Sequence, residues 1–242
     1  IGAVDTSLWD LKGRILNTSV NNLIGGFAKS APVVRFRYYE EGAGDEEIEQ
    51  LLESKDNGFG GVKLKVGRAS VAEDINRVKR IRQSLGDDFM IICDANEGWY
   101  LTEAIQFARE TEQYELAWLE EPVRWHNAVE NMRKVRESTI TPVCAGQGEN
   151  NKWGCWRLIE NESVDVINVD ASIAGGITEW QKIRSAAEIN GIKMGNHEEP
   201  HISVHLMSAI PNGTFVEVFE EFRDPAYHQM NKILPEISNG SI

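Results

Sequence analysis

The sequence is poor in three features: long hydrophobic runs, cysteine and positive charge. No apolar run among its 242 residues is long enough to span a membrane, and no signal peptide stands at its start. The 25 basic residues are outnumbered by 38 acidic ones, which gives a net charge of −13. Such a surface argues against binding to nucleic acid or to anionic membranes. It does not exclude a small anionic substrate, because a local site can oppose the global field.

Cysteine occurs three times, an odd number without metal-ligand spacing: Cys93, Cys144 and Cys155. Cys93 and Cys144 lie in apolar runs typical of strands. We therefore expect reduced cysteines in the core of a cytoplasmic protein. With 41% hydrophobic and 26% charged residues, the composition is that of a globular protein.

A glycine-rich phosphate turn is also missing after the first expected strand. The acidic stretch YEEGAGDEE occupies that place, at residues 39–47, whereas an open doubly wound sheet usually carries the glycine-rich turn there. From residue 32 onward, short apolar runs alternate with segments of helical periodicity. Eight such units in roughly 200 residues suit a TIM-type barrel of the modified (β/α)7β kind. The open sheet stays the alternative.

The expected strands are short and apolar, often with β-branched residues. They cover residues 33–39, 61–66, 90–95, 116–121, 142–146, 164–169, 192–196 and 215–219. The expected helices are charged, and several begin with Ser, Thr or Asp and end near Gly or Asn. They cover residues 45–54, 70–86, 101–113, 128–138, 153–161 and 176–191.

The first residues differ from this pattern. Residues 1–26 have the periodicity of one amphipathic helix, and the chain has no initiator Met. We expect this helix to be the end of an earlier domain. The expected division is a remnant with its linker at residues 1–31 and a catalytic barrel at residues 32–242.

Polar residues stand at the carboxyl ends of the expected strands, where barrel enzymes place their active sites. The residues concerned are Lys63, Lys65, Asp94, Glu120, Gln147, Glu149, Asp170, His197 and Glu217. Lys63 and Lys65 share one face of a strand, because side chains two residues apart point the same way. Two ammonium groups side by side cost desolvation and repulsion.

Each of these residues also has a structural explanation. A lone carboxylate after a strand is commonly a helix cap or a solvated loop residue. A lone histidine is commonly a core or surface residue, and the two lysines could lie on an edge strand. Taken together these explanations are less convincing, because they do not account for why each successive strand ends in a residue suited to metal binding or proton transfer. The pattern therefore favours an active site.

The residue types indicate the chemistry. Asp94 and Glu120 are hard oxygen ligands that, with a third ligand, suit Mg²⁺. Crowding by a like charge, the metal and partial burial should lower the pKa values of the lysines, so that one can accept a proton. On the other side, Asp170 could orient the imidazole of His197 and stabilise its protonated form. A metal between two bases suits abstraction of the proton alpha to a carboxylate, through an enediolate.

These residues resemble the enolase superfamily, specifically its mandelate racemase subgroup. The similarity covers nearly the whole chain and rests on KLK (63–65), DAN (94–96), LEEP (119–122), NVDASIAGGITEW (168–180) and GNH (195–197). The resemblance implies substrate positioning and base chemistry by Lys63 and Lys65, with Asp170 and His197 as the second base. It also implies a metal at Asp94 and Glu120. Asn96 and Glu217, with Lys63, would bind the substrate.

Two departures from the family pattern matter. The family normally has an N-terminal capping domain, of which only the last helix is expected here. The third metal ligand is usually Glu, at the position that Gln147 occupies in AGQGE. An amide oxygen can bind Mg²⁺, and the alternative is that Glu149 takes this role. The sequence leaves both open.

The resemblance implies an acid-sugar dehydratase, a hydro-lyase that converts an aldonate or aldarate to a 2-keto-3-deoxy acid. One alternative is a racemase or epimerase of a 2-hydroxy acid with the same two bases. Others are a non-catalytic barrel with an incomplete metal site, and a barrel aldolase or other metal lyase. We further expect Mg²⁺ as cofactor, a small anionic acid sugar as substrate, a homo-oligomer and a cytoplasmic location.

Overall fold

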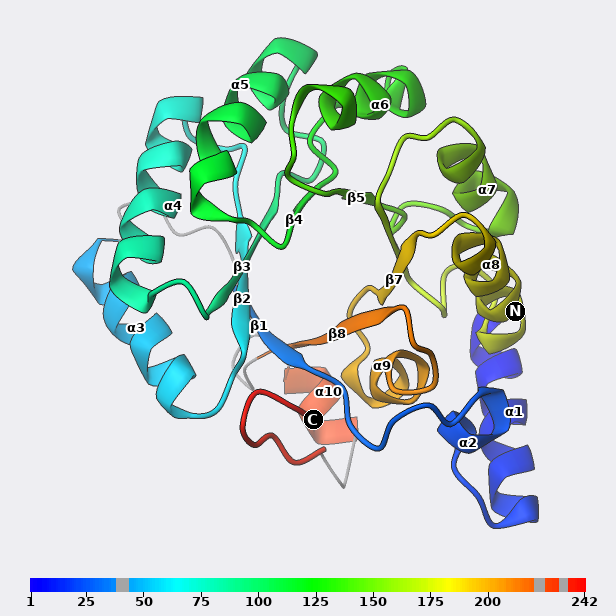
Figure 1. Ribbon diagram of the computed structural model, residues 1–242. Coiled ribbons are helices and arrows are strands. Elements are labelled where there is room, and N and C mark those ends of the chain that lie inside the picture. Colours follow the sequence, from blue (N-terminus) through cyan, green and yellow to red (C-terminus); the bar gives the residue numbers. More distant parts are fainter. Residues whose placement is uncertain (38–43, 220–224, 231–234) are drawn as a thin grey trace.

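Eight parallel strands close into a barrel in sequence order, from β1 to β8 (Figure 1). The structure is a computed structural model, and it describes residues 1–37, 44–219, 225–230 and 235–242. The strands are β1 (Val33–Arg37), β2 (Gly61–Lys65), β3 (Met90–Asp94), β4 (Trp118–Glu120), β5 (Val143–Ala145), β6 (Val166–Val169), β7 (Lys193–Asn196) and β8 (Gly213–Val218). All eight expected strands are confirmed to within a few residues; residues 38 and 39 lie outside the described part.

Helices surround the barrel on its outer face (Figure 1). They are α1 (Gly2–Leu16), α2 (Val20–Ile24), α3 (Asp45–Asp56), α4 (Val71–Leu85), α5 (Leu101–Thr111), a 3-10 turn η1 (Glu112–Tyr114), α6 (Ala128–Ser138), α7 (Lys152–Glu160), α8 (Ile177–Ile189), α9 (Pro200–Met207) and α10 (Pro225–Met230). Seven strand–helix units followed by β8 confirm the modified barrel and rule out the open sheet. The six expected helices are present, whereas α9 was missed.

Local sequence explains where the helices begin and end. Ser70 accepts the backbone N–H of Glu73, and the Glu73 side chain accepts the Ser70 N–H, so α4 starts with a capping box. It ends at Gly86, whose φ of 79° favours glycine. At α9, Pro200 occupies the first turn after Glu199, whose φ is 49°. A glutamate in this left-handed conformation is a weak sequence signal for the start of a helix, which is why α9 was not predicted.

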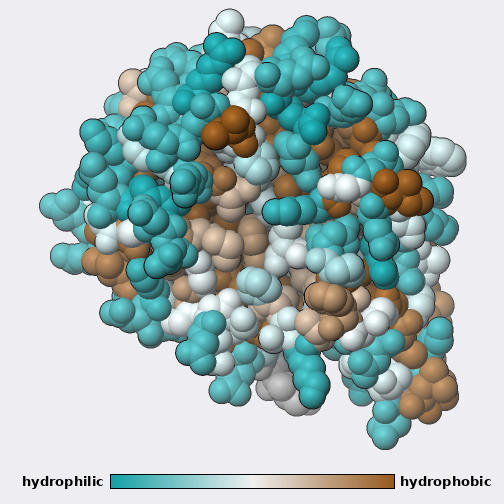
Figure 2. All heavy atoms as spheres, in the orientation of Figure 1, coloured by the Kyte–Doolittle hydropathy of each residue, from teal (hydrophilic) through white to brown (hydrophobic). Residues whose placement is uncertain are grey.

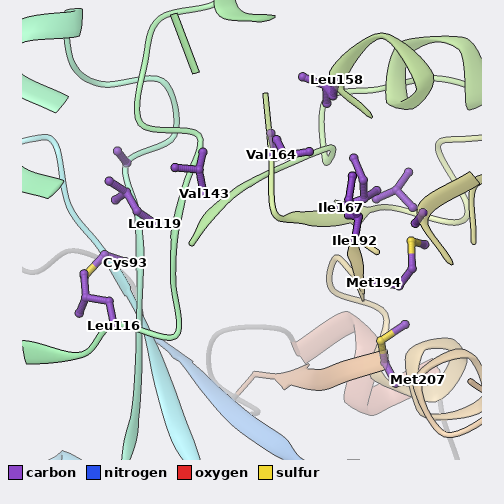
Figure 3. Close-up of a cluster of buried hydrophobic side chains, with 14 of the residues drawn as sticks. Cys93, Leu116, Leu119, Val143, Leu158, Val164, Ile167, Ile192, Met194 and Met207 are labelled. Carbon is purple, nitrogen blue, oxygen red and sulfur yellow. The ribbon is translucent and has the colours of Figure 1, made fainter. Parts of the chain in front are cut away.

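Side chains along each strand point alternately outward and inward, so the hydrophobic core has two layers. Outward side chains pack beneath the helices, and Figure 3 shows part of this layer around Leu119, Val143 and Ile167. Inward side chains fill the barrel with Val34, Ile92, Trp118, Cys144, Val166 and Phe215. All three cysteines are buried and free, as expected. Among the described residues, no helix has the length and apolar character that crossing a bilayer requires.

The start of the chain forms two helices, which corrects the expected single one. Asn17 takes a left-handed conformation with φ 50°, and Ser19 then caps α2 by accepting the N–H of Asn22. Helix α1 lies beside α8 (Figure 1). Its apolar row, Val4, Leu8, Leu11 and Ile15, is 49–73% exposed. Hydrophobic atoms accordingly appear at the lower right of Figure 2, where α1 lies.

Candidate active site

Charged side chains meet inside the carboxyl end of the barrel. Lys63 on β2, Asp94 on β3, Glu120 on β4 and Glu217 on β8 are each at most 1% exposed. Strand register brings them together, because Asp94 pairs with Glu120 and also with Lys65. The structure therefore gathers four of the predicted residues into one buried cluster.

Lys63 is the centre of this cluster. Its Nζ lies 3.0 Å from Glu120 Oε1, 3.0 Å from Glu217 Oε1 and 3.4 Å from Asp94 Oδ2. Burial alone would lower the pKa of Lys63, but Glu120, Glu217 and Asp94 raise it well above its ordinary value. Among the protein's own groups, the three carboxylates thus outweigh crowding and burial at Lys63, whereas the expected lowering of its pKa also depended on the metal.

Lys65 faces the same side of β2 but is partly open, with its side chain 14% exposed. Its Nζ lies 2.5 Å from Asp94 Oδ2 and 4.8 Å from the centre of the Phe36 ring; Lys63 Nζ lies 5.8 Å from that ring. The predicted shared face is thus confirmed, and the edge-strand explanation is excluded because the barrel is closed.

The carboxylates of the cluster differ in the direction in which their pKa values are shifted. Burial raises the pKa of Asp94, but Lys63 and Lys65 outweigh it, so the pKa lies below its ordinary value. Glu217 is also lowered in pKa, because Lys63 and His197 outweigh burial. The pKa of Glu120 is raised by burial and by its acidic neighbours.

His197 and Asp170 lie together, as predicted. Asp170 Oδ2 is 3.6 Å from His197 Nδ1, which is longer than a hydrogen bond but close for opposite charges. Burial lowers the pKa of His197, yet Asp170 and Glu217 raise it above its ordinary value. The imidazolium is therefore stabilised. Asp170 also caps the following turn, because its Oδ1 accepts the Ile173 N–H at 2.9 Å.

Gln147 and Glu149 point to different places. The Gln147 amide donates to Glu121 Oε2 at 2.6 Å, at the mouth of the barrel. Glu149 packs against the first turn of α7, where a Cβ on Gly154 would come within 1.6 Å of its Oε2. Burial, followed by Glu120 and Asp94, raises the pKa of Glu121 to about 8.

The donor set fits Mg²⁺, provided that an amide takes part. Carboxylate and amide oxygens are suitable ligands; Asp94 ends β3, Glu120 ends β4, and Gln147 follows β5. In the described part of the chain, no three His, Cys, Asp or Glu side chains are grouped so that they could hold a metal. A third carboxylate ligand from Glu149 is thus not prepared in this structure.

Asn96 is exposed at the barrel mouth, and its backbone N–H donates to Asp94 Oδ1 at 2.9 Å. Two residues in contact with the cluster were missed, Trp118 and Asn168, both of which donate to Glu120. Each stands two residues before a predicted site residue, so strand alternation could have found them. A separate hollow of about 470 Å³ opens at the amino end of the strands, between residues such as Met90, Trp118 and Phe215.

Similar proteins of known activity are dehydratases and cycloisomerases. The chain is 31% identical over 226 residues to L-talarate/galactarate dehydratase of Salmonella typhimurium, covering 91% of this chain and 55% of the relative. It is 34% identical over 222 residues to 3,6-anhydro-alpha-L-galactonate cycloisomerase of Streptomyces coelicolor, covering 90% and 60%. The chain thus spans somewhat more than half the length of these relatives.

Solved structures agree with this similarity. A mandelate racemase/muconate lactonizing enzyme from a marine actinobacterium, in complex with magnesium, has a TM-score of 0.95 at 38% identity and covers 100% of this chain and 68% of its own. L-talarate dehydratase from Polaromonas sp. JS666, complexed with Mg and L-glucarate, has a TM-score of 0.92 at 31% identity, covering 99% and 66%. The enolase C-terminal domain-like model matches residues 46–242. The resemblance is confirmed, and the chain belongs to the enolase C-terminal domain-like family.

Proposed function

We propose that the protein is a Mg²⁺-dependent hydro-lyase that removes the proton alpha to a carboxylate of an acid sugar and expels the beta-hydroxyl as water. The observation that carries this proposal is the cluster at the carboxyl end of the barrel. It combines a lysine from β2, a histidine–aspartate pair following β7 and β6, and buried carboxylates between them. The dehydratase relatives support the same chemistry.

Asp94, Glu120 and the Gln147 amide would hold the metal. Mg²⁺ bound there would stabilise negative charge that develops on a substrate oxygen. Gln147 is already held at the mouth by Glu121, whereas Glu149 is turned to α7. These contacts favour Gln147 over Glu149 as the third protein ligand.

The chain's own residues move the protons. Lys65, as a neutral amine, accepts the alpha proton at Nζ while the C–H electron pair enters an enediolate. His197, as imidazolium, donates its proton to the beta-hydroxyl, so that the C–O bond breaks and water leaves. Asp170 and Glu217 favour this protonated state by raising the pKa of His197. The product is a 2-keto-3-deoxy acid.

The presence of two bases also supports a second candidate, racemisation or epimerisation of a 2-hydroxy acid. In that reaction one base removes the alpha proton and the other returns a proton to the opposite face. The substrate identity, a homo-oligomeric state, a cytoplasmic location and a domain boundary after residue 31 stay predictions.

The test is a screen of acid sugars with the protein and Mg²⁺. Semicarbazide detects the 2-keto acid, and polarimetry detects racemisation. Asp94→Asn should abolish the activity. Asp165→Asn is the matched control, since Asp165 lies at the other end of the barrel and binds Arg136. A change in rotation without 2-keto acid would favour the second candidate, and no reaction with any acid sugar would contradict the first.

A further inference from the structure

We propose that Trp118 and Asn168 are positioning residues that hold the Glu120 carboxylate in the orientation needed to bind the metal. This inference rests on the proposed function, because it takes Glu120 as a ligand. It assigns a role to two neutral side chains that both donate to Glu120.

Trp118 holds one oxygen of the carboxylate. Its Nε1 donates to Glu120 Oε2 at 2.9 Å, and the indole is only 2% exposed. The ring stacks on Phe215 with centroids 4.4 Å apart and planes at 18°. Because the ring is fixed by this packing, the direction of its N–H is fixed as well.

Asn168 holds the other oxygen. Its Nδ2 donates to Glu120 Oε1 at 3.0 Å and to Glu217 Oε1 at 3.1 Å, and the residue is 1% exposed. The neighbouring strand makes room for this amide, because a Cβ on Gly195 would come within 2.5 Å of Asn168 Oδ1. The glycine of the GNH motif thus serves the placement of Asn168.

Together the two donors prevent the carboxylate from turning. Lys63 approaches both Glu120 oxygens at 3.0 Å, so this single ammonium group does not distinguish between them. Trp118, on β4, binds one oxygen of Glu120, and Asn168, on β6, binds the other. The two contacts together set the plane of the carboxylate. Hydrogen-bond donors behind a ligand raise metal affinity by orienting it before binding.

The experiment compares Trp118→Phe and Asn168→Ala with matched controls. Trp180→Phe removes an equally buried indole whose N–H has no hydrogen-bond partner in the described structure. Asn21→Ala removes a buried amide that binds Ser208, far from the cluster. Mg²⁺ affinity is measured by titration calorimetry, and folding is checked by thermal unfolding without metal.

Either site variant should weaken Mg²⁺ binding by about 10- to 100-fold, while the controls change it by less than about twofold. The double variant should lose less than the product of the single effects, because both donors act on one carboxylate. With an active substrate, kcat at subsaturating Mg²⁺ should fall while KM changes little.

Variants that melt earlier but bind Mg²⁺ as the unmodified protein does would overturn the inference and leave the proposed function standing. Absence of Mg²⁺ binding in the unmodified protein would overturn both. If a variant does not fold, Trp118→Leu and Asn168→Leu, which also lack the donor, take its place with the same expected loss of Mg²⁺ affinity.

Discussion

Lys63 and Lys65 stand two residues apart on β2, yet their ammonium groups have different surroundings. Lys63 is fully buried among three carboxylates, and these keep its pKa well above the ordinary value. Lys65 reaches the partly open mouth and has one carboxylate partner at 2.5 Å. Lys63 is therefore enclosed by carboxylates, and in the proposed reaction Lys65 is the better placed of the two to accept a proton.

Substitution of the two bases should separate the two halves of the reaction. Lys65→Ala should abolish both dehydration and exchange of the alpha proton with solvent deuterium, each by about 100- to 10,000-fold. His197→Asn should block dehydration but permit exchange, because Lys65 still forms the enediolate. NMR of deuterium incorporation and the 2-keto acid assay measure the two steps. Exchange that survives in Lys65→Ala and vanishes in His197→Asn would reverse the assignment.

The third metal ligand can be identified by a similar pair of substitutions, at Gln147 and Glu149. Gln147→Ala should weaken Mg²⁺ binding by at least about tenfold, or 1.4 kcal/mol. Glu149→Ala should change it by less than about 0.5 kcal/mol, since Glu149 packs against α7. Calorimetric titration provides both numbers. The reverse order would identify Glu149, and small effects from both variants would place the third ligand elsewhere.

At the scale of elements, one carboxylate joins α3 to α4 and β1. Glu47 on α3 is 2% exposed; its Oε1 lies 3.3 Å from Arg37 Nε and 3.1 Å from Arg77 Nε. Arg77 also donates to the backbone oxygen of Lys65 at 2.7 Å, at the end of β2. This contact links the outer helices to the strand that carries both lysines.

Removal of this carboxylate should destabilise the barrel. Glu47→Ala leaves the buried guanidinium group of Arg37 and the largely buried one of Arg77 without it, so the free energy of unfolding should fall by about 3–5 kcal/mol. Glu49→Ala, on the exposed side of the same helix, should change it by less than about 0.5 kcal/mol. Urea denaturation measures both. Equal small effects would mean that the ion pair contributes no net stability.

Helix α1 shows that hydrophobic periodicity can predict a helix without predicting which of its faces contacts the rest of the protein. It contacts α8 through polar groups: Trp9 donates to Thr178 Oγ1 at 2.9 Å, and Asp5 accepts the Thr178 N–H at 2.9 Å. Its apolar row faces away from the barrel. The amphipathic pattern correctly indicated helical structure, but the exposed apolar row is not the face that contacts the barrel, where Trp9 packs against the core.

For the molecule as a whole, Mg²⁺ should raise the melting temperature, because a ligand that binds only the folded state stabilises it. At 100 times the dissociation constant the gain is about 2.7 kcal/mol. Differential scanning calorimetry with and without millimolar Mg²⁺ measures the shift. Asp94→Asn should remove it, and an unmodified protein that shows no shift would contradict the metal site.

Stability should also depend on pH through α9. Burial lowers the pKa of His205 below its ordinary value, although Asp10 opposes this. A lowered pKa favours the neutral imidazole in the folded state, so this stability is present above the unfolded pKa of about 6.5 and is lost as pH falls through the folded pKa. His205→Gln should flatten the decline between about pH 7 and 5 in chemical denaturation. His126→Gln, at an exposed position, should not.

The amino-acid sequence alone was enough to predict the barrel architecture and most residues of the charged cluster at its carboxyl end. Alternating apolar runs and helical segments predict a closed parallel barrel because each pattern has its own period, and strand ends in such a barrel must meet. KLK, DAN, LEEP and GNH therefore indicated which side chains converge. The same alternation could have indicated Trp118 and Asn168, each two residues before a predicted site residue, but the sequence analysis missed both.

The tertiary structure decided which residues remote in sequence contact one another, which the local sequence pattern does not determine. Lys63 meets Glu217 across 154 residues, and Asn168 meets Glu120 across 48. Long-range contacts of this kind set the pKa of Lys63, the pairing of Gln147 with Glu121 and the outward apolar face of α1. Each depends on distances between strands or helices that are remote in sequence, and those distances exist only once the barrel has closed.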